Sequence, residues 1–154
     1  MKIDHPAHGT TLKTAFIAGA SGLVGHTLLN LLLNAPEYGQ VTAIVRHALP
    51  LHHEKLVQII DPMTDGDFFA SRVRGDDVFC CLGTTQKKAG SQAAFRCIDY
   101  DLPMALARAA KQNGVSHFIV ISAMGANPES FSFYSRVKGQ LERDLGDLAL
   151  PRLS

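Results

Sequence analysis

Short apolar runs alternate with longer stretches of helical periodicity along nearly the whole chain. The apolar runs are five or six residues long, which predicts buried strands at 14–18, 41–45, 56–60, 77–82 and 117–121. Most of the stretches between them repeat apolar residues every three or four positions, which predicts helices at 23–33, 67–73, 92–112 and 133–148. The exception is a polar loop between the second and third strands.

This alternation indicates the fold class. Apolar strands separated by helices form a parallel sheet that helices cover on both faces, and right-handed crossovers make it a doubly wound α/β domain. We expect that domain over residues 14–154, about five strands wide, after a polar N-terminal tail at residues 1–13. Residues 150–154 resemble the entry to a sixth strand, so the C-terminal strands of the full pattern are expected to be missing.

A glycine-rich turn, GASGLVG, follows the first predicted strand and opens the first predicted helix. In such a turn one glycine permits the tight bend, one lets the backbone approach a pyrophosphate, and one lets the helix pack close to the strand. The helix N-terminus offers free N–H groups and a partial positive charge to phosphates. This context favours nucleotide binding over an ordinary turn, and no GK[ST] follows, which excludes a Walker P-loop. The residues expected to bind the nucleotide are Gly19, Ser21, Gly22, Leu23, Val24 and Gly25.

The end of the second predicted strand is where a dinucleotide-binding sheet meets the adenosine ribose. An acidic residue there binds the 2′-hydroxyl of NAD, whereas this chain has Arg46 followed by His47. The planar guanidinium of an arginine suits a 2′-phosphate, so the sequence favours NADP(H) over NAD(H). The alternative is that Arg46 is an ordinary solvated surface residue.

A tyrosine and a lysine lie four residues apart in the last predicted helix. Tyr134 and Lys138 therefore share one helix face, and Ser122 follows the fifth strand at the sheet edge where such folds bind ligands. A phenol is a poor acid–base group at neutral pH, and a neighbouring cation makes it a better one. This predicts that Tyr134 donates a proton to a carbonyl oxygen that receives hydride, while Lys138 supports the phenolate and Ser122 holds the substrate oxygen. Taken alone, the pair also fits a packed tyrosine beside a solvated lysine.

Together these motifs resemble the short-chain dehydrogenase/reductase superfamily, in its extended or atypical branch. The chain is most similar to bacterial relatives of the Tat-interacting-protein-like oxidoreductases. The resemblance covers most of residues 14–145 and rests on GASGLVG, the VR after the second strand, DVFCCLGTTQKKAG, FRCIDY, HFIVISAMGA and YSRVKGQLE.

The resemblance implies an NAD(P)-binding Rossmann fold and an NADP(H)-dependent reductase or dehydrogenase of a small carbonyl or alcohol substrate. It implies that the turn glycines hold the pyrophosphate and Arg46 the 2′-phosphate, and that Lys138 also touches the nicotinamide ribose. Asp61, after the third strand, matches the position near the adenine. The segment that lines the ribose and nicotinamide is implied to be Cys81, Leu82, Gly83 and Thr84. Members of the family continue for several more strands and helices, which complete much of the substrate pocket.

Several alternatives stay open at this point. The short C-terminus also fits a non-catalytic module that binds NADP(H) as a redox sensor or regulator, or a fragment of a longer chain. Asp99 is either a hydrogen-bonding group of the site or a helix-surface acid. The pair Lys87 and Lys88 is interpreted as an exposed loop pair, and Cys80 and Cys81 as small core hydrophobes.

Composition and charge bear on partners and location. Fifteen Lys and Arg against fourteen Asp and Glu give a net charge of +1, which offers no electrostatic reason for a nucleic-acid or anionic membrane partner. The seven histidines and three cysteines lack the spacing of a zinc site. Sparse cysteine and no signal-peptide pattern predict a cytoplasmic protein. A fifth strand at a free sheet edge predicts self-association as a homodimer.

Overall fold

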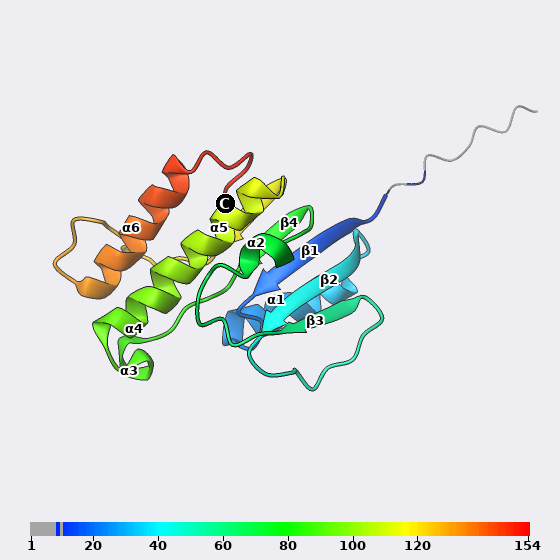
Figure 1. Ribbon diagram of the computed structural model, residues 1–154, viewed down its shortest axis with the longest axis horizontal. Coiled ribbons are helices and arrows are strands. Elements are labelled where there is room, and N and C mark those ends of the chain that lie inside the picture. The colour runs from blue at the N-terminus through cyan, green and yellow to red at the C-terminus, as the bar shows by residue number, and fades with distance from the viewer. Residues whose placement is uncertain (1–8, 10) are drawn as a thin grey trace, which may run out of the picture.

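The computed structural model describes residue 9 and residues 11–154, and its centre is one parallel sheet. Five strands lie in the order β3-β2-β1-β4-β5, with every neighbouring pair parallel. Their bounds are β1 (Lys13–Ala18), β2 (Tyr38–Val45), β3 (Leu56–Ile60), β4 (Asp77–Cys80) and β5 (His117–Val120). The predicted doubly wound fold is confirmed, and Figure 1 shows the sheet with helices on both sides.

Helices cover the two faces of the sheet unequally. The helical segments are α1 (Leu23–Asn34), α2 (Phe69–Arg72), α3 (Gln86–Ala89), α4 (Gln92–Arg96), η1 (Cys97–Asp101), α5 (Leu102–Gln112) and α6 (Phe133–Asp147). Buried side chains of α1 pack with one face of the sheet, whereas those of α2, α5 and α6 pack with the other. Figure 1 shows α5 and α6 side by side, with α1 on the far side of the sheet from α2.

The alternation of side chains along β1 divides the core in two. Ala15 and Ile17 belong to the cluster with α1, and Phe16 and Ala18 to the cluster with α5 and α6. Successive strand residues point to opposite faces, so a strand covered on both faces is apolar throughout. This is why the central strand has no polar residue between positions 15 and 18.

The predicted helix at 92–112 contains a break in its regular winding. The five residues of η1 form a π-helical segment between α4 and α5. Ser91 caps α4 by accepting from the N–H of Ala94, and Pro103 lies in the first turn of α5. A π-helical turn inserts into an α-helix without ending it and often marks a functional site. The short α3 is a second element that the sequence pattern did not predict.

A buried carboxylate holds the amino ends of the strands together. Asp77 at the start of β4 accepts a hydrogen bond from the hydroxyl of Tyr38 at 2.6 Å and pairs with Nζ of Lys13 at 3.1 Å. His117 at the start of β5 places Nδ1 3.9 Å from the same carboxylate. Asp77 on β4 thus links the amino ends of β1, β2 and β5 at one point.

The last residues pair with β5 as the start of a further parallel strand. The N–H of Phe118 donates to the carbonyl of Arg152 at 2.9 Å, and the N–H of Ser154 donates back to Phe118 at 3.0 Å. Residues 150–154 thus form the predicted entry to a sixth strand, joined by a bridge from Leu153. The homodimer prediction assumed that the edge of β5 is bare, and this pairing removes that premise.

The N-terminal segment is described only in part. Residues 1–8 and 10 of the predicted polar tail lie outside the described residues, and β1 begins at Lys13, one residue earlier than predicted. Among the described residues, no helix has the length and hydropathy that crossing a membrane requires.

Candidate functional site

The order of the strands reverses between β1 and β4, and a cavity opens at their carboxyl ends. Doubly wound sheets bind their ligands at such a switch point. The cavity, which we call the switch-point cleft, has a volume of about 610 Å³, within the range of small-molecule sites. The predicted cofactor residues that line it are Gly19, Ser21, Gly22, Arg46, Cys81, Leu82, Gly83 and Thr84.

Two glycines of the turn are required by close packing. Gly19 has φ +88°, and a Cβ there would overlap the backbone carbonyl of Cys81. A Cβ on Gly25 would overlap the carbonyl oxygen of Gly19. The turn therefore packs backbone on backbone, which leaves the space above it open to a ligand.

The N-terminus of α1 differs from those of α3, α4 and α6. The latter three are capped by the side chains of Thr85, Ser91 and Ser132, whereas α1 begins after Gly22 with no side-chain cap and no acidic residue in its first turn. Leu23 and Val24 are exposed here, and neither is among the residues that line the cleft. Free N–H groups at a helix N-terminus bind anions such as phosphate.

Two cations line the switch-point cleft. Arg46 follows β2, as predicted, and Lys88 reaches the same cleft from α3. The lining residues include no aspartate or glutamate. The interpretation of Lys88 as a plain exposed loop residue is therefore incomplete, and no sequence signal marks it, because only the path of the chain after β4 brings α3 to the cleft.

Asp61 shapes the cleft without lining it. Its carboxylate accepts a hydrogen bond from the N–H of Met63 at 2.8 Å. Met63 has φ +52°, an uncommon conformation that this bond supports. The turn puts Pro62, Met63 and Thr64 on the cleft wall. In this structure Asp61 acts through that turn rather than from the cleft surface.

The cysteines at the end of β4 are neutral thiols. Burial raises the pKa of Cys81 to about 11 and the pKa of Cys80 to about 12. Cys80 is fully buried in the core and Cys81 is half-buried on the cleft wall. Both fit the expected small apolar role better than nucleophilic or redox chemistry, which requires a thiolate.

Two of the three predicted catalytic residues lie together on α6, and the third follows β5. Tyr134 and Lys138 lie one turn apart on α6, with the Lys138 Nζ 6.0 Å from the centre of the Tyr134 ring. The ring packs on Phe95 and is half-buried. Ser122 follows β5, and its Oγ is shielded from solvent with no hydrogen-bond partner among the described residues. None of the three is among the residues that line the cleft.

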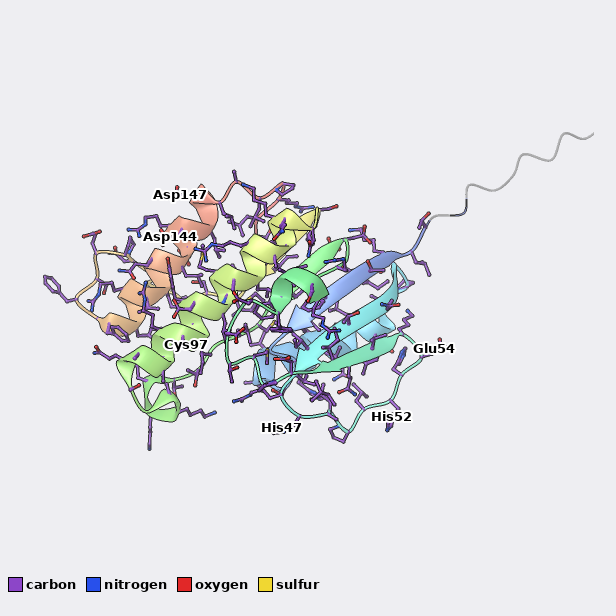
Figure 2. All side chains as sticks on the ribbon, in the orientation of Figure 1. His47, His52, Glu54, Cys97, Asp144 and Asp147 are labelled. Carbon is purple, nitrogen blue, oxygen red and sulfur yellow. The ribbon has the colours of Figure 1, made fainter. Side chains whose placement is uncertain are left out.

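A buried carboxylate joins Lys138 to the cleft wall. Asp99 in η1 is fully buried and lies 2.6 Å from the Lys138 Nζ, while its second oxygen accepts from the N–H of Thr84 at 2.9 Å. Of its two interpretations from sequence, the helix-surface acid is therefore wrong. Figure 2 labels Cys97, the cleft-lining residue at the start of η1, and His47, which follows Arg46 after β2.

The remaining titratable residues of the described part of the chain form no metal centre. Among the described residues, no group of three or more His, Cys, Asp or Glu side chains is arranged to hold a metal ion. His52 and Glu54 lie on the loop between β2 and β3 (Figure 2).

Sequence comparisons relate the chain to known proteins. A family described as NAD(P)H-binding matches residues 19–146. Protein HTATIP2 of Rattus norvegicus is 38% identical over 146 residues, covering 92% of this chain and 60% of that protein. The mitochondrial protein FMP52 of Meyerozyma guilliermondii is 34% identical over 140 residues, covering 90% of this chain and 60% of that protein. The chain thus spans about 60% of the length of these relatives.

Solved structures show the same fold at low identity. The Bordetella bronchiseptica enzyme WbmH in complex with NAD+ has a TM-score of 0.77 and 19% identity, covering 92% of this chain and 54% of its own. A short chain dehydrogenase family protein of Francisella tularensis has a TM-score of 0.66 and 16% identity, covering 90% of this chain and 66% of its own. The resemblance expected from the motifs is confirmed.

The predicted cytoplasmic location is contradicted. Relatives from Coccidioides immitis, Candida albicans and Debaryomyces hansenii, 32% to 33% identical, are named as mitochondrial proteins, as is that of Meyerozyma guilliermondii. Sparse cysteines are equally compatible with any reducing compartment, so they do not single out the cytosol.

Proposed function

The chain belongs to the NAD(P)H-binding family, and we propose that it is an NADP(H)-dependent oxidoreductase that interconverts a small carbonyl compound and its alcohol. The observation that carries the proposal is the placement of a buried, ion-paired lysine, Lys138, next to a tyrosine and directly behind the wall of the switch-point cleft. A bound dinucleotide would supply the hydride in reduction and accept it in oxidation. The residues of the chain supply binding, orientation and a proton.

The residues present fit a dinucleotide. Close packing leaves no room for a side chain at Gly19 or Gly25, and the uncapped N-terminus of α1 offers N–H groups to the pyrophosphate. Ser21 lines the cleft beside them and adds a hydroxyl donor. The segment from Cys81 to Thr84 lines the opposite side, towards Lys138.

Charge at the cleft supports NADP(H) over NAD(H). Arg46 and Lys88 both line the cleft, and no acidic side chain is present to bind a free 2′-hydroxyl. An arginine fork binds a phosphate through paired charge-assisted hydrogen bonds, and a lysine acts as a point charge. We place the 2′-phosphate between these two cations.

We assign proton transfer to Tyr134. The phenol donates its proton to the substrate oxygen in reduction and accepts it in oxidation. Lys138 stabilises the phenolate and holds the nicotinamide ribose, and Ser122 donates its unpaired hydroxyl to the substrate oxygen. A buried hydroxyl without a partner is costly, so a substrate oxygen at this place would satisfy it.

Binding and turnover test this proposal separately. Titration with NADPH, followed by its fluorescence, is expected to saturate, and a flat titration would refute the proposal. In Tyr134→Phe, turnover of NADPH with a panel of small aldehydes and ketones is expected to fall by about 10²–10⁴-fold with NADPH affinity unchanged.

The matched control is Tyr100→Phe. Tyr100 donates to Asp144 at the contact between η1 and α6 and lies outside the proposed machinery. It should keep the wild-type rate. If Tyr134→Phe keeps its turnover as well, the protein binds NADP(H) without using Tyr134.

A further inference from the structure

Asp99 is a charged residue enclosed in the protein interior. Its exposure is 0%, and the side chain of its partner Lys138 is 6% exposed. Removing a carboxylate and an ammonium from water costs several kcal/mol per ion, and an apolar pair of similar volume is often no less stable. Packing alone therefore gives no reason for a charge at this position.

The π-helical segment joins α6 through three polar contacts. Arg96, directly before it, donates to Gln140 at 2.8 Å, and Tyr100 donates to Asp144. Both of these contacts are partly exposed, whereas the pair of Asp99 and Lys138 is enclosed. The outer contacts fasten the two helical segments, so the buried pair is not needed for that purpose.

The same carboxylate reaches the switch-point cleft. One oxygen binds Lys138, and the other accepts from the N–H of Thr84 at 2.9 Å. A Cβ on Gly83 would lie 3.4 Å from the first oxygen and 3.8 Å from the Lys138 Nζ. Gly83 and Thr84 both line the cleft, so the ion pair lies immediately behind its wall.

We propose that Asp99 is a positioning residue that holds the Lys138 ammonium behind Gly83 and ties it to the backbone of Thr84, so that occupation of the cleft by cofactor and the placement of Lys138 are coupled. The inference rests on the proposed function, because it gives Lys138 a role in holding the ribose. The Lys138 Nζ lies 2.6 Å from one oxygen of Asp99, so the ion pair fixes the distance between the two groups.

Other titratable groups lie near this pair on β4 and α6. Cys80 on β4 is influenced by both members of the pair, but its pKa of about 12 keeps it neutral near physiological pH. Tyr134 on α6 faces Lys138 at 6.0 Å. Without Asp99 the buried ammonium has no counter-charge, and an uncompensated buried charge is costly.

The first experiment measures NADPH affinity at neutral pH for wild type, Asp99→Asn and Asp99→Glu. We expect Asp99→Asn to bind about tenfold more weakly, and Asp99→Glu, which keeps the carboxylate, to recover part of the lost affinity. Tyr100→Phe, which removes an outer contact of the same interface, is expected to retain the wild-type affinity. Unchanged affinity in Asp99→Asn overturns the inference.

The second experiment needs no substitution, so it decides the question if Asp99→Asn does not fold. In the wild-type protein, the ¹³C resonance of the Asp99 carboxyl is expected to move on saturation with NADP+. The carboxyl of Asp77, also buried but at the amino ends of the strands, is the internal control and should stay fixed. A static Asp99 resonance overturns the coupling. Absence of NADPH binding by the wild-type protein would instead overturn the proposed function.

Discussion

Arg46 and Lys88 come from positions 42 residues apart, yet both line the switch-point cleft. Each is a candidate for ligand binding only because it lies at the cleft, since the same side chain elsewhere on the surface would be solvated and would affect neither binding nor stability measurably. Asp99 illustrates the same point in the interior, where its pairing with Lys138 turns an unremarkable helix residue into part of the site. Residue type thus limits which interactions a side chain can make, and its position in the fold decides which of them it does make.

The two cations predict cofactor preference. Arg46→Ala and Lys88→Ala should each weaken NADPH binding by about tenfold, because each removes a charged contact to the 2′-phosphate worth about 1.5–3 kcal/mol in favourable geometry. NADH lacks that phosphate, so its affinity should change little. Calorimetric titration with both nucleotides measures the ratio.

Lys87→Ala is the matched control. Lys87 is an exposed neighbour on the same short helix that does not line the cleft. It should leave the NADPH to NADH ratio as in wild type. Equal losses for both nucleotides in Arg46→Ala would contradict the placement of the 2′-phosphate.

The junction of β1 and α1 is the element on which the cleft depends. The buried glycine in the first turn of α1 lets the helix approach the strand until backbone meets backbone. A second irregular element is η1, which interrupts the helix between residues 92 and 112. Asp99 in this segment is buried. The packing of helices and strands thus sets the distances between side chains, which the residue types alone do not define.

Gly25→Ala tests that junction. The added Cβ would collide with the carbonyl oxygen of Gly19, so we expect a loss of about 1–3 kcal/mol in the free energy of unfolding together with weaker NADPH binding. Urea unfolding and NADPH titration measure the two effects.

Gly146→Ala is the control for this substitution. Gly146 is also helical, near the end of α6, and its Cβ would meet no atom within 4 Å. Alanine there should raise stability by about 0.5–1 kcal/mol. A Gly25→Ala protein as stable as wild type would show that the close approach is not required.

At the scale of the whole molecule, the two ends of the sheet carry different sets of side chains. The residues that line the switch-point cleft gather at the carboxyl ends of the strands, and a network around buried Asp77 links the amino ends of β1, β2 and β4. Burial and the hydrogen bond to Asp77 raise the pKa of Tyr38 above its ordinary value.

This network predicts how stability depends on pH. Because the pKa of Tyr38 is higher in the folded state, its contribution is fully present below the unfolded pKa of about 10 and is lost as the pH rises further. In Tyr38→Phe, unfolding should cost about 1.5–3 kcal/mol less at neutral pH. The difference between the two proteins should shrink above about pH 10, which denaturant unfolding at several pH values measures. A constant difference across that range would argue against the raised pKa.

Much of the architecture could be predicted because the spacing of apolar residues and the composition of a segment depend only on residues close together in the chain. The apolar runs of β1 and β3 gave boundaries within one residue, and the glycine turn was placed between a strand and a helix as observed. β2 begins three residues before its predicted start, at Tyr38, because an aromatic residue bonded to Asp77 continues the strand beyond its apolar run. The π-helical η1 has no sequence period of its own, so it could not be predicted.

The sequence by itself determined the doubly wound sheet, the glycine turn and the spacing of Tyr134 and Lys138, because each depends on residues near one another in the chain. Only the tertiary structure decided that Lys88 joins Arg46 at the cleft and that Asp99 is buried against Lys138. It also decided that residues 152–154 cover the edge of β5. Each of these brings together residues more than 30 positions apart, and such proximity follows from how the helices and strands pack rather than from local pattern.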